Sequence, residues 1–154
     1  MPPQTQAFDD LSRLPDALHA WITQLSLNGR VDADAATLLA LALHEWTANL
    51  VQHATWCGEA RVVVSVAESG GRLHCAVEDT SAGFDLAGAL HSRRVGFEGL
   101  PERGMGLLML DALADGLDYA PVAPSRAATP RHRLRFRLRT DGPGLDVTHA
   151  GLVP

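Results

Sequence analysis

Two stretches near the start of the chain are patterned as helices, and the first places apolar residues at the three- and four-residue steps of an amphipathic helix. The first covers residues 9–27, and Pro15 fits only in a first turn, so the regular helix is expected to begin there. The second starts after Asp32 or Asp34, either of which can cap it, and runs to about Ala54. Because it is apolar on nearly every side, it is expected in the middle of the domain.

Strand patterns follow these helices. Residues 60–68 and 72–79 are rich in β-branched and apolar residues and flank the turn sequence Ser69-Gly70-Gly71, which predicts a hairpin. A further helix is expected from about Met105 to Ala114. The chain thus changes from helical to hairpin patterning after its first third.

Two more short strands are expected at about 116–121 and 131–139. In the second, arginines alternate with apolar residues, as in a strand with one face on a core. Residues 86–103 show weak periodicity and many glycines and arginines, which predicts a long loop. For a strand before the first helix, residues 5–8 are the only candidate.

The order of helices, hairpin, loop, helix and two strands predicts an α/β fold of the two-layer sandwich type. We expect a mixed sheet of about four to five strands with helices on one face. The single domain should span residues 8–140, with flexible termini at 1–7 and 141–154.

Composition places the chain among ordinary globular domains. It has 154 residues, of which 46% are hydrophobic and 20% charged, and a net charge of -5, which gives no electrostatic case for nucleic acid or an anionic membrane. The first residues lack the basic and apolar regions of a signal peptide. Cys57 and Cys75 lack metal-ligand spacing and are expected to be reduced thiols in a cytoplasmic protein.

Glu45 and Asn49 are polar residues on the second, otherwise apolar helix. Residues advance about 100° each on a helix, so side chains four residues apart converge on one side. A glutamate there can act as a general base, and an asparagine oxygen suits Mg²⁺, which takes few protein ligands. The pair alone is equally compatible with an exposed polar stripe that has no role.

Two turns that contain glycine add to this pattern. Asp79 ends a strand, where a carboxylate can accept a hydrogen bond from an exocyclic amine, and Gly83 allows a flat ring to approach closely. Taken alone, Asp79 is more simply explained as a residue that terminates a strand. Gly104 and Gly106 open a helix whose free N–H groups and dipole favour phosphate. Together the three segments predict a nucleotide site.

In combination these residues resemble the motifs of the GHKL ATPase superfamily, most closely its stand-alone branch of anti-sigma factor serine kinases (RsbW-like). The N box of that branch, E-x-x-x-N-x-x-x-H-A, is met by Glu45, Asn49, His53 and Ala54. The G1 box, D-x-G-x-G-F-D, is met by Asp79, Gly83, Phe84 and Asp85. The G2 box is met by Gly104, Gly106 and Leu107. Ser81 replaces the first glycine of the G1 box, which is tolerated only if its φ is below zero.

The resemblance, over about residues 10–139, implies a Bergerat-type ATP site. Asn49 would hold Mg²⁺ between the phosphates, and Glu45 would be the base toward the protein hydroxyl that is phosphorylated. Asp79 would bind adenine, with Gly83 beneath the ring and Thr129 assisting through water.

The resemblance also assigns the phosphate end of the site. Gly104 and Gly106 would meet the phosphates, and the further cofactor-binding residues that the resemblance implies are His53, Arg103, Met105 and Leu107. Arg103 would reach the γ-phosphate, although a solvated position is an equal alternative, and residues 86–103 would form the ATP lid.

The activity that this resemblance implies is that of an ATP- and Mg²⁺-dependent serine/threonine kinase. It would phosphorylate a STAS-type anti-anti-sigma protein, sequester a sigma factor and form a homodimer, without direct contact to nucleic acid or membrane. Two alternatives stay open: a nucleotide-binding switch that never transfers phosphate, and a detached catalytic module of a histidine kinase.

Overall fold

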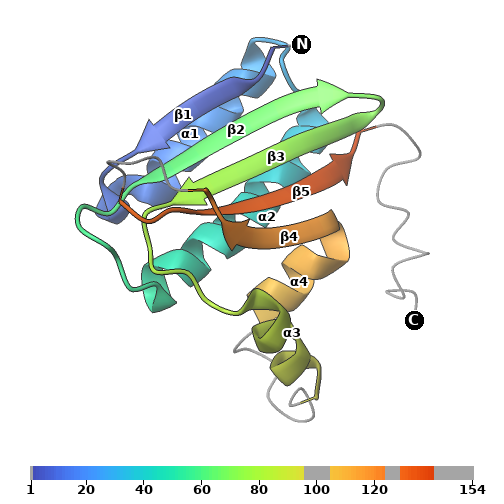
Figure 1. The fold of residues 1–154 in the computed structure, drawn as a ribbon. Helices are drawn as coiled ribbons and strands as arrows, with labels where there is room; N and C mark the ends of the chain where they lie inside the picture. The colour runs from blue at the N-terminus through green and yellow to red at the C-terminus, as the bar shows by residue number, and fades with distance from the viewer. Residues whose placement is uncertain (1, 96–104, 124–128, 141–154) are drawn as a thin grey trace.

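The computed structural model describes residues 2–95, 105–123 and 129–140. Two long helices, α1 (Leu14–Leu27) and α2 (Ala33–His53), lie on one face of a five-stranded sheet (Figure 1). A short 3₁₀ helix, η1 (Leu11–Arg13), precedes α1, and Pro15 lies in the first turn of α1. Asp32 caps α2, because its Oδ1 accepts a hydrogen bond from the Ala35 amide at 2.8 Å. Both predicted helix starts are confirmed.

The sheet has the strand order β1-β2-β3-β5-β4. The strands are β1 (Gln4–Phe8), β2 (Val62–Ser69), β3 (Arg72–Asp79), β4 (Asp115–Pro121) and β5 (His132–Arg139). All neighbouring pairs among them are antiparallel, so the prediction of a mixed sheet is wrong. A helical crossover from β3 to β4 would allow parallel neighbours, but β5 lies between these two strands and pairs with both.

The N-terminal segment is an ordered edge strand. Residues 4–8 pair with β2 from Gln4 opposite Val66 to Phe8 opposite Val62, and Phe8 is buried in the core. The expectation of a flexible segment at 1–7 therefore does not hold for residues 4–7. The expected flexible tail, 141–154, lies outside the described residues.

Part of the predicted loop at 86–103 is helical. Helix α3 (Leu86–Val95) begins after Asp85, whose Oδ1 accepts a hydrogen bond from the Gly88 amide at 3.0 Å. This contact caps the helix, and Leu86 and Leu90 are buried. The remainder of the predicted loop lies outside the described residues. Helix α4 (Met105–Leu113) follows, close to the predicted bounds.

The core lies between the helices and the sheet. From α2 it takes Leu39, Leu43, Trp46 and Leu50, and from the central strands it takes Val62, Val64, Leu73, Val77, Leu134 and Leu138. These residues are almost fully buried, whereas Leu41 and Val51 of the same helix are exposed, so burial explains only part of the nearly continuous apolar pattern of α2. Among the described residues, no helix combines the length and apolar character needed to cross a membrane.

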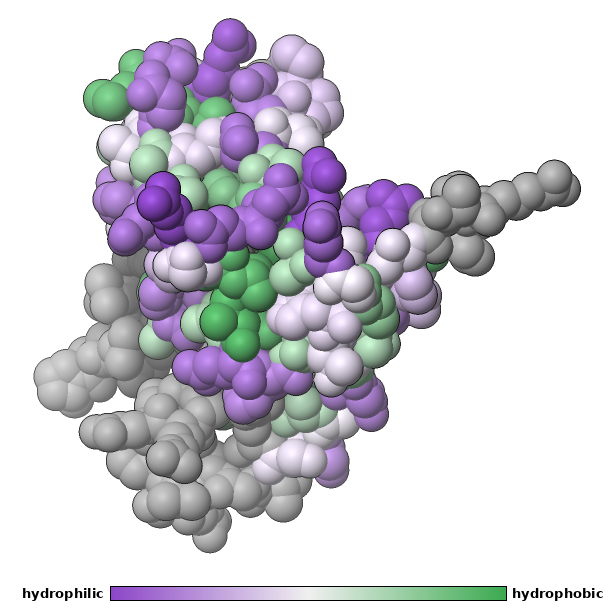
Figure 2. Space-filling view, turned by 90° about the vertical axis from the view of Figure 1, so that its left-hand side faces the viewer, coloured by the Kyte–Doolittle hydropathy of each residue, from purple (hydrophilic) through white to green (hydrophobic). Residues whose placement is uncertain are grey.

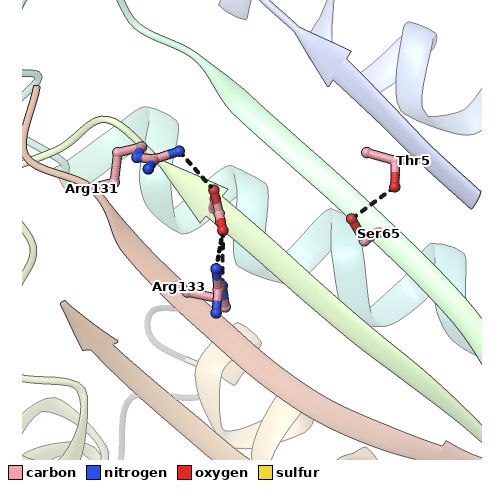
Figure 3. Close-up of polar contacts among 5 residues, drawn as sticks. Thr5, Ser65, Arg131 and Arg133 are labelled. Carbon is pink, nitrogen blue, oxygen red and sulfur yellow. Dashed lines mark hydrogen bonds and ion pairs between the residues drawn. The ribbon is translucent and has the colours of Figure 1, made fainter. Parts of the chain in front are cut away.

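The opposite face of the sheet is polar and carries cross-strand pairs. Thr5 and Ser65 share a hydrogen bond of 3.0 Å between neighbouring strands (Figure 3). Glu78 accepts from Nη1 of Arg131 at 3.3 Å and from Nε of Arg133 at 2.9 Å (Figure 3). The carboxylate of Glu78 therefore offsets part of the positive charge of the arginines on this face of the sheet.

Candidate functional site

Glu45 and Asn49 lie on the same side of α2, one turn apart, and both are half-buried. The neighbouring Trp46 points into the core, where it is completely buried. This arrangement fixes the rotation of α2, because a buried Trp46 leaves Glu45 and Asn49 at the margin of the helical layer. The two polar residues are thus accessible without being fully exposed.

The first turn of α4 packs against Glu45. A Cβ atom added at Gly106 would collide with Oε2 of Glu45 and lie 3.3 Å from its Cδ. Leu107 and Leu110, on the same short helix, are buried against the core and hold α4 in this place. The absence of a side chain at Gly106 therefore lets the Glu45 carboxylate reach the N-terminal turn of α4, where free amides favour negative charge.

Asp79 is the last residue of β3, and its side chain is only 1% exposed. Its Oδ1 accepts hydrogen bonds from the amide of Ser81 at 3.0 Å and from Oγ of Ser81 at 2.5 Å. Its Oδ2 accepts a hydrogen bond from the Tyr119 hydroxyl at 3.0 Å. A buried carboxylate needs such donors, and three of them fix its orientation.

Ser81 organises the turn after β3. No described residue other than glycine has a positive φ, so the condition that the sequence sets for a serine at 81 is met. Its Oγ also accepts a hydrogen bond from the amide of Gly83, at 3.1 Å, and its carbonyl accepts one from Nδ1 of His132, at 3.1 Å. Because a carbonyl only accepts, the proton of a neutral His132 lies on Nδ1.

Gly83 has a φ of +76°, and a Cβ added there would lie 2.6 Å from Cε1 of His132. A side chain is therefore excluded both by backbone conformation and by space. His132 is the first residue of β5 and lies directly opposite Asp79 in the antiparallel register. The turn after β3 and the start of β5 are thus packed against one another.

An aromatic cluster joins α2 to this turn. The ring of Trp46 lies 5.5 Å from that of Phe84 and 5.0 Å from that of Tyr119, measured between centroids. Phe84 and Tyr119 are 5.0 Å apart, and Tyr119 and His132 are 5.5 Å apart. Burial raises the pKa of the Tyr119 phenol, so this hydroxyl stays a hydrogen-bond donor at neutral pH.

The structure brings α2, the turn after β3 and the start of α4 together, through the contact between the Trp46 and Phe84 rings and through the approach of Glu45 to Gly106. Figure 2 views the molecule from the side where β3 and α2 end and shows a hydrophobic area in its middle, with hydrophilic residues around it. A model of the histidine kinase-like ATPase domain family matches residues 9–128. The chain belongs to this family. No curated protein matches the chain.

Membership of the histidine kinase-like ATPase family, within the GHKL superfamily, makes this an ATP-binding, kinase-like domain. The residues present fit that ligand, because a buried carboxylate ends β3 and a helix start lies beside a glutamate. Among the described residues, no group of three or more His, Cys, Asp or Glu side chains could hold a metal ion.

The other residues that the sequence predicts for the site differ in position and exposure, and some lie outside the described residues. His53 ends α2 and is exposed, and Met105 begins α4. Thr129 is exposed and borders a hollow of about 550 Å³ that Asp79 also borders. Arg103 and Gly104 lie outside the described residues.

Sequence reasoning missed Tyr119 and His132. Tyr119 contacts Asp79 from β4, and His132 contacts the turn from β5, so both depend on strand register. The alternation of β5 does place His132 on the same face as Leu134, which a register argument could have used. Nothing local marks Tyr119.

Proposed function

We propose that this ATPase domain is a serine/threonine kinase of the anti-sigma type, which uses ATP with Mg²⁺. It phosphorylates a STAS-type anti-anti-sigma protein and sequesters a sigma factor, and it works as a homodimer in the cytoplasm. One observation carries the catalytic part: the Glu45 carboxylate lies against the first turn of α4, at Gly106. A base candidate is therefore next to the helix end that favours phosphate.

Different groups of the chain would bind the base, the phosphates and Mg²⁺. Asp79 supplies a carboxylate acceptor for the base, and the N-terminal turn of α4 supplies backbone N–H donors for phosphate. Asn49 supplies a neutral oxygen for Mg²⁺, one helical turn from Glu45.

Bound MgATP would supply the phosphoryl group for transfer to a serine or threonine oxygen of the partner, and ADP would be the leaving group. Glu45 would take the proton of the attacking serine or threonine hydroxyl on its carboxylate and release it to solvent afterwards. Its half-buried position supports this role, because the side chain is accessible to a hydroxyl that a protein partner presents.

A phosphotransfer assay tests the proposal. The protein is incubated with MgATP and candidate STAS-type proteins, and phosphoserine or phosphothreonine on the partner is measured by mass spectrometry. Transfer is expected for the wild type and should fall at least about a hundredfold in Glu45→Ala, the usual scale of general-base catalysis. Glu68→Ala, at an exposed glutamate near the far end of β2, is the matched control and should transfer normally.

Two other results would change the conclusion. ATP binding without transfer to any such partner would overturn the kinase and leave a nucleotide-dependent switch. Transfer that survives in Glu45→Ala would remove Glu45 as the base. The homodimer is tested separately by analytical ultracentrifugation, where a monomer at micromolar concentration would contradict it.

A further inference from the structure

The carboxylate of Asp79, on which base binding in the proposed function rests, is already engaged. Tyr119 donates its hydroxyl hydrogen to Oδ2 at 3.0 Å, while Ser81 occupies Oδ1. With Asp79 only 1% exposed and both of its oxygens engaged, the carboxylate is not free for a ligand in the conformation observed. A nucleotide base that binds Asp79 must therefore move one of the groups that cover it.

Tyr119 is the covering group best able to move. Ser81 lies only two residues from Asp79 and holds it through both its amide and its hydroxyl. Tyr119 is forty residues away in sequence, lies on β4 at the edge of the sheet, and is half-buried. Its ring is held by packing against Trp46, Phe84 and His132, and its hydroxyl is held by the hydrogen bond to Asp79 and by the nearby Ser81 side chain.

A second observation concerns a buried hydrogen-bond donor beside Tyr119 that lacks an acceptor. The indole Nε1–H of Trp46 is buried and has no hydrogen-bond partner among the described residues. An unpaired buried donor of this kind is costly and calls for an explanation. Trp46 lies against Tyr119, so an arrangement in which Tyr119 moves also changes the surroundings of this indole.

We propose that Tyr119 closes the base site: its hydroxyl occupies the Oδ2 atom of Asp79 and competes with the exocyclic amine of an adenine base for it. Phenol and amine are both donors to the same acceptor, so one replaces the other without leaving the carboxylate unpaired. The inference rests on the proposed ATP site but not on phosphate transfer. Binding then requires an open conformation, and the apparent affinity falls by the fraction of molecules that are open.

The direction in which one substitution changes the affinity for ATP tests this competition. Tyr119→Phe keeps the ring and removes the hydroxyl that favours the closed conformation. A hydrogen bond to a carboxylate is strong enough that its loss should tighten ATP binding by at least about tenfold, or about 1.4 kcal/mol, in isothermal titration calorimetry. If Tyr119 instead only orients Asp79 for the base, the same substitution weakens binding and the proposal is overturned.

Ser81→Ala is the matched control. It also removes one hydroxyl donor from Asp79, but from Oδ1 and without freeing Oδ2. ATP binding by Ser81→Ala should be unchanged or weaker than that of the wild type. Equal tightening in both variants would mean that any lost donor suffices, and it would overturn the specific role of Tyr119.

A structural readout exists because Tyr119 is the only tyrosine of the chain. Ring-labelled tyrosine therefore gives a single set of NMR signals. Addition of ATP should weaken the nuclear Overhauser effect between Tyr119 and Trp46, whose centroids are 5.0 Å apart. An unchanged effect at saturating ATP would contradict displacement.

The ATP site and its closure by Tyr119 can be disproved separately. If the wild type binds ATP and Tyr119→Phe binds it no better, closure by Tyr119 is wrong while the ATP site stands. If neither protein binds ATP, the proposed site is wrong and the inference falls with it. Binding by Tyr119→Phe alone would support both.

Discussion

A methyl group added at Gly106 tests how Glu45 is held. In Gly106→Ala the new Cβ would collide with Oε2 of Glu45, which is the free end of a flexible side chain. The glutamate must therefore rotate away from α4, at a cost of about 1 kcal/mol, while alanine stabilises a helix by up to about 1 kcal/mol relative to glycine. The two terms nearly cancel, so the melting temperature should change by less than about 4 °C.

Function should respond far more than stability does. A displaced base loses its contribution to proton transfer, which is typically about 10²–10⁴-fold in rate. The assay is phosphoryl transfer to the STAS-type partner, measured beside thermal unfolding of the same samples. Met109→Ala, on the exposed side of the same helix, is the control for any general disturbance of α4 and should transfer at the wild-type rate.

A double-substitution cycle separates the possible causes. If Gly106→Ala acts only by moving Glu45, it should add no further loss of transfer or of ATP affinity in a Glu45→Ala background. A further loss there would mean that the methyl group obstructs the nucleotide itself. Undiminished transfer in Gly106→Ala alone would refute the idea that contact with α4 positions the base.

Two other outcomes follow from the described contacts. Asn49→Ala should make ATP affinity insensitive to Mg²⁺ in calorimetry with and without EDTA, whereas the exposed Gln52→Ala should keep that dependence. Burial raises the pKa of the Cys75 thiol and of the Tyr119 phenol. The unfolded chain therefore loses these protons first, so the free energy of unfolding should fall as pH rises above about 9 for the thiol and above about 10 for the phenol. The fall is up to about 1.4 kcal/mol per pH unit for the buried thiol and smaller for the half-buried phenol, because solvent screens its charge. Urea titrations of Cys75→Ala and Tyr119→Phe should each show a smaller fall, and an unchanged slope in both would contradict this explanation.

The parts of the fold that sequence predicts well are those decided by neighbouring residues. Asp32 caps α2, Pro15 lies in the first turn of α1, and the Ser69-Gly70-Gly71 turn joins two strands of matching pattern. Helix α3 was missed because its arginines and Gly88 obscure the helical period, although Asp85 is a capping residue followed by buried leucines at 86 and 90.

Only part of the site can be predicted from motifs of neighbouring residues. Glu45, Asn49, Asp79 and Gly106 follow from motif spacing, whereas the group that covers Asp79 does not. Tyr119 faces Asp79 because β4 pairs with β5 through an irregularity between Asp115 and Asp118, which sets the faces of the residues after it. Pairing between strands distant in the chain determines that register, and no pattern within β4 reveals it.

The central claim is that Asp79 anchors a base in an ATP site. Calorimetric titration of ATP with Mg²⁺ into the wild type and into Asp79→Asn tests it most directly, with thermal unfolding as the control for folding. An asparagine offers one acceptor oxygen and brings two donor hydrogens to a place that Ser81 and Tyr119 already fill with donors, which costs about 1–3 kcal/mol. We predict binding by the wild type and at least about tenfold weaker binding by folded Asp79→Asn. Equal affinity in the two proteins, or no binding by the wild type and Tyr119→Phe alike, would contradict the account.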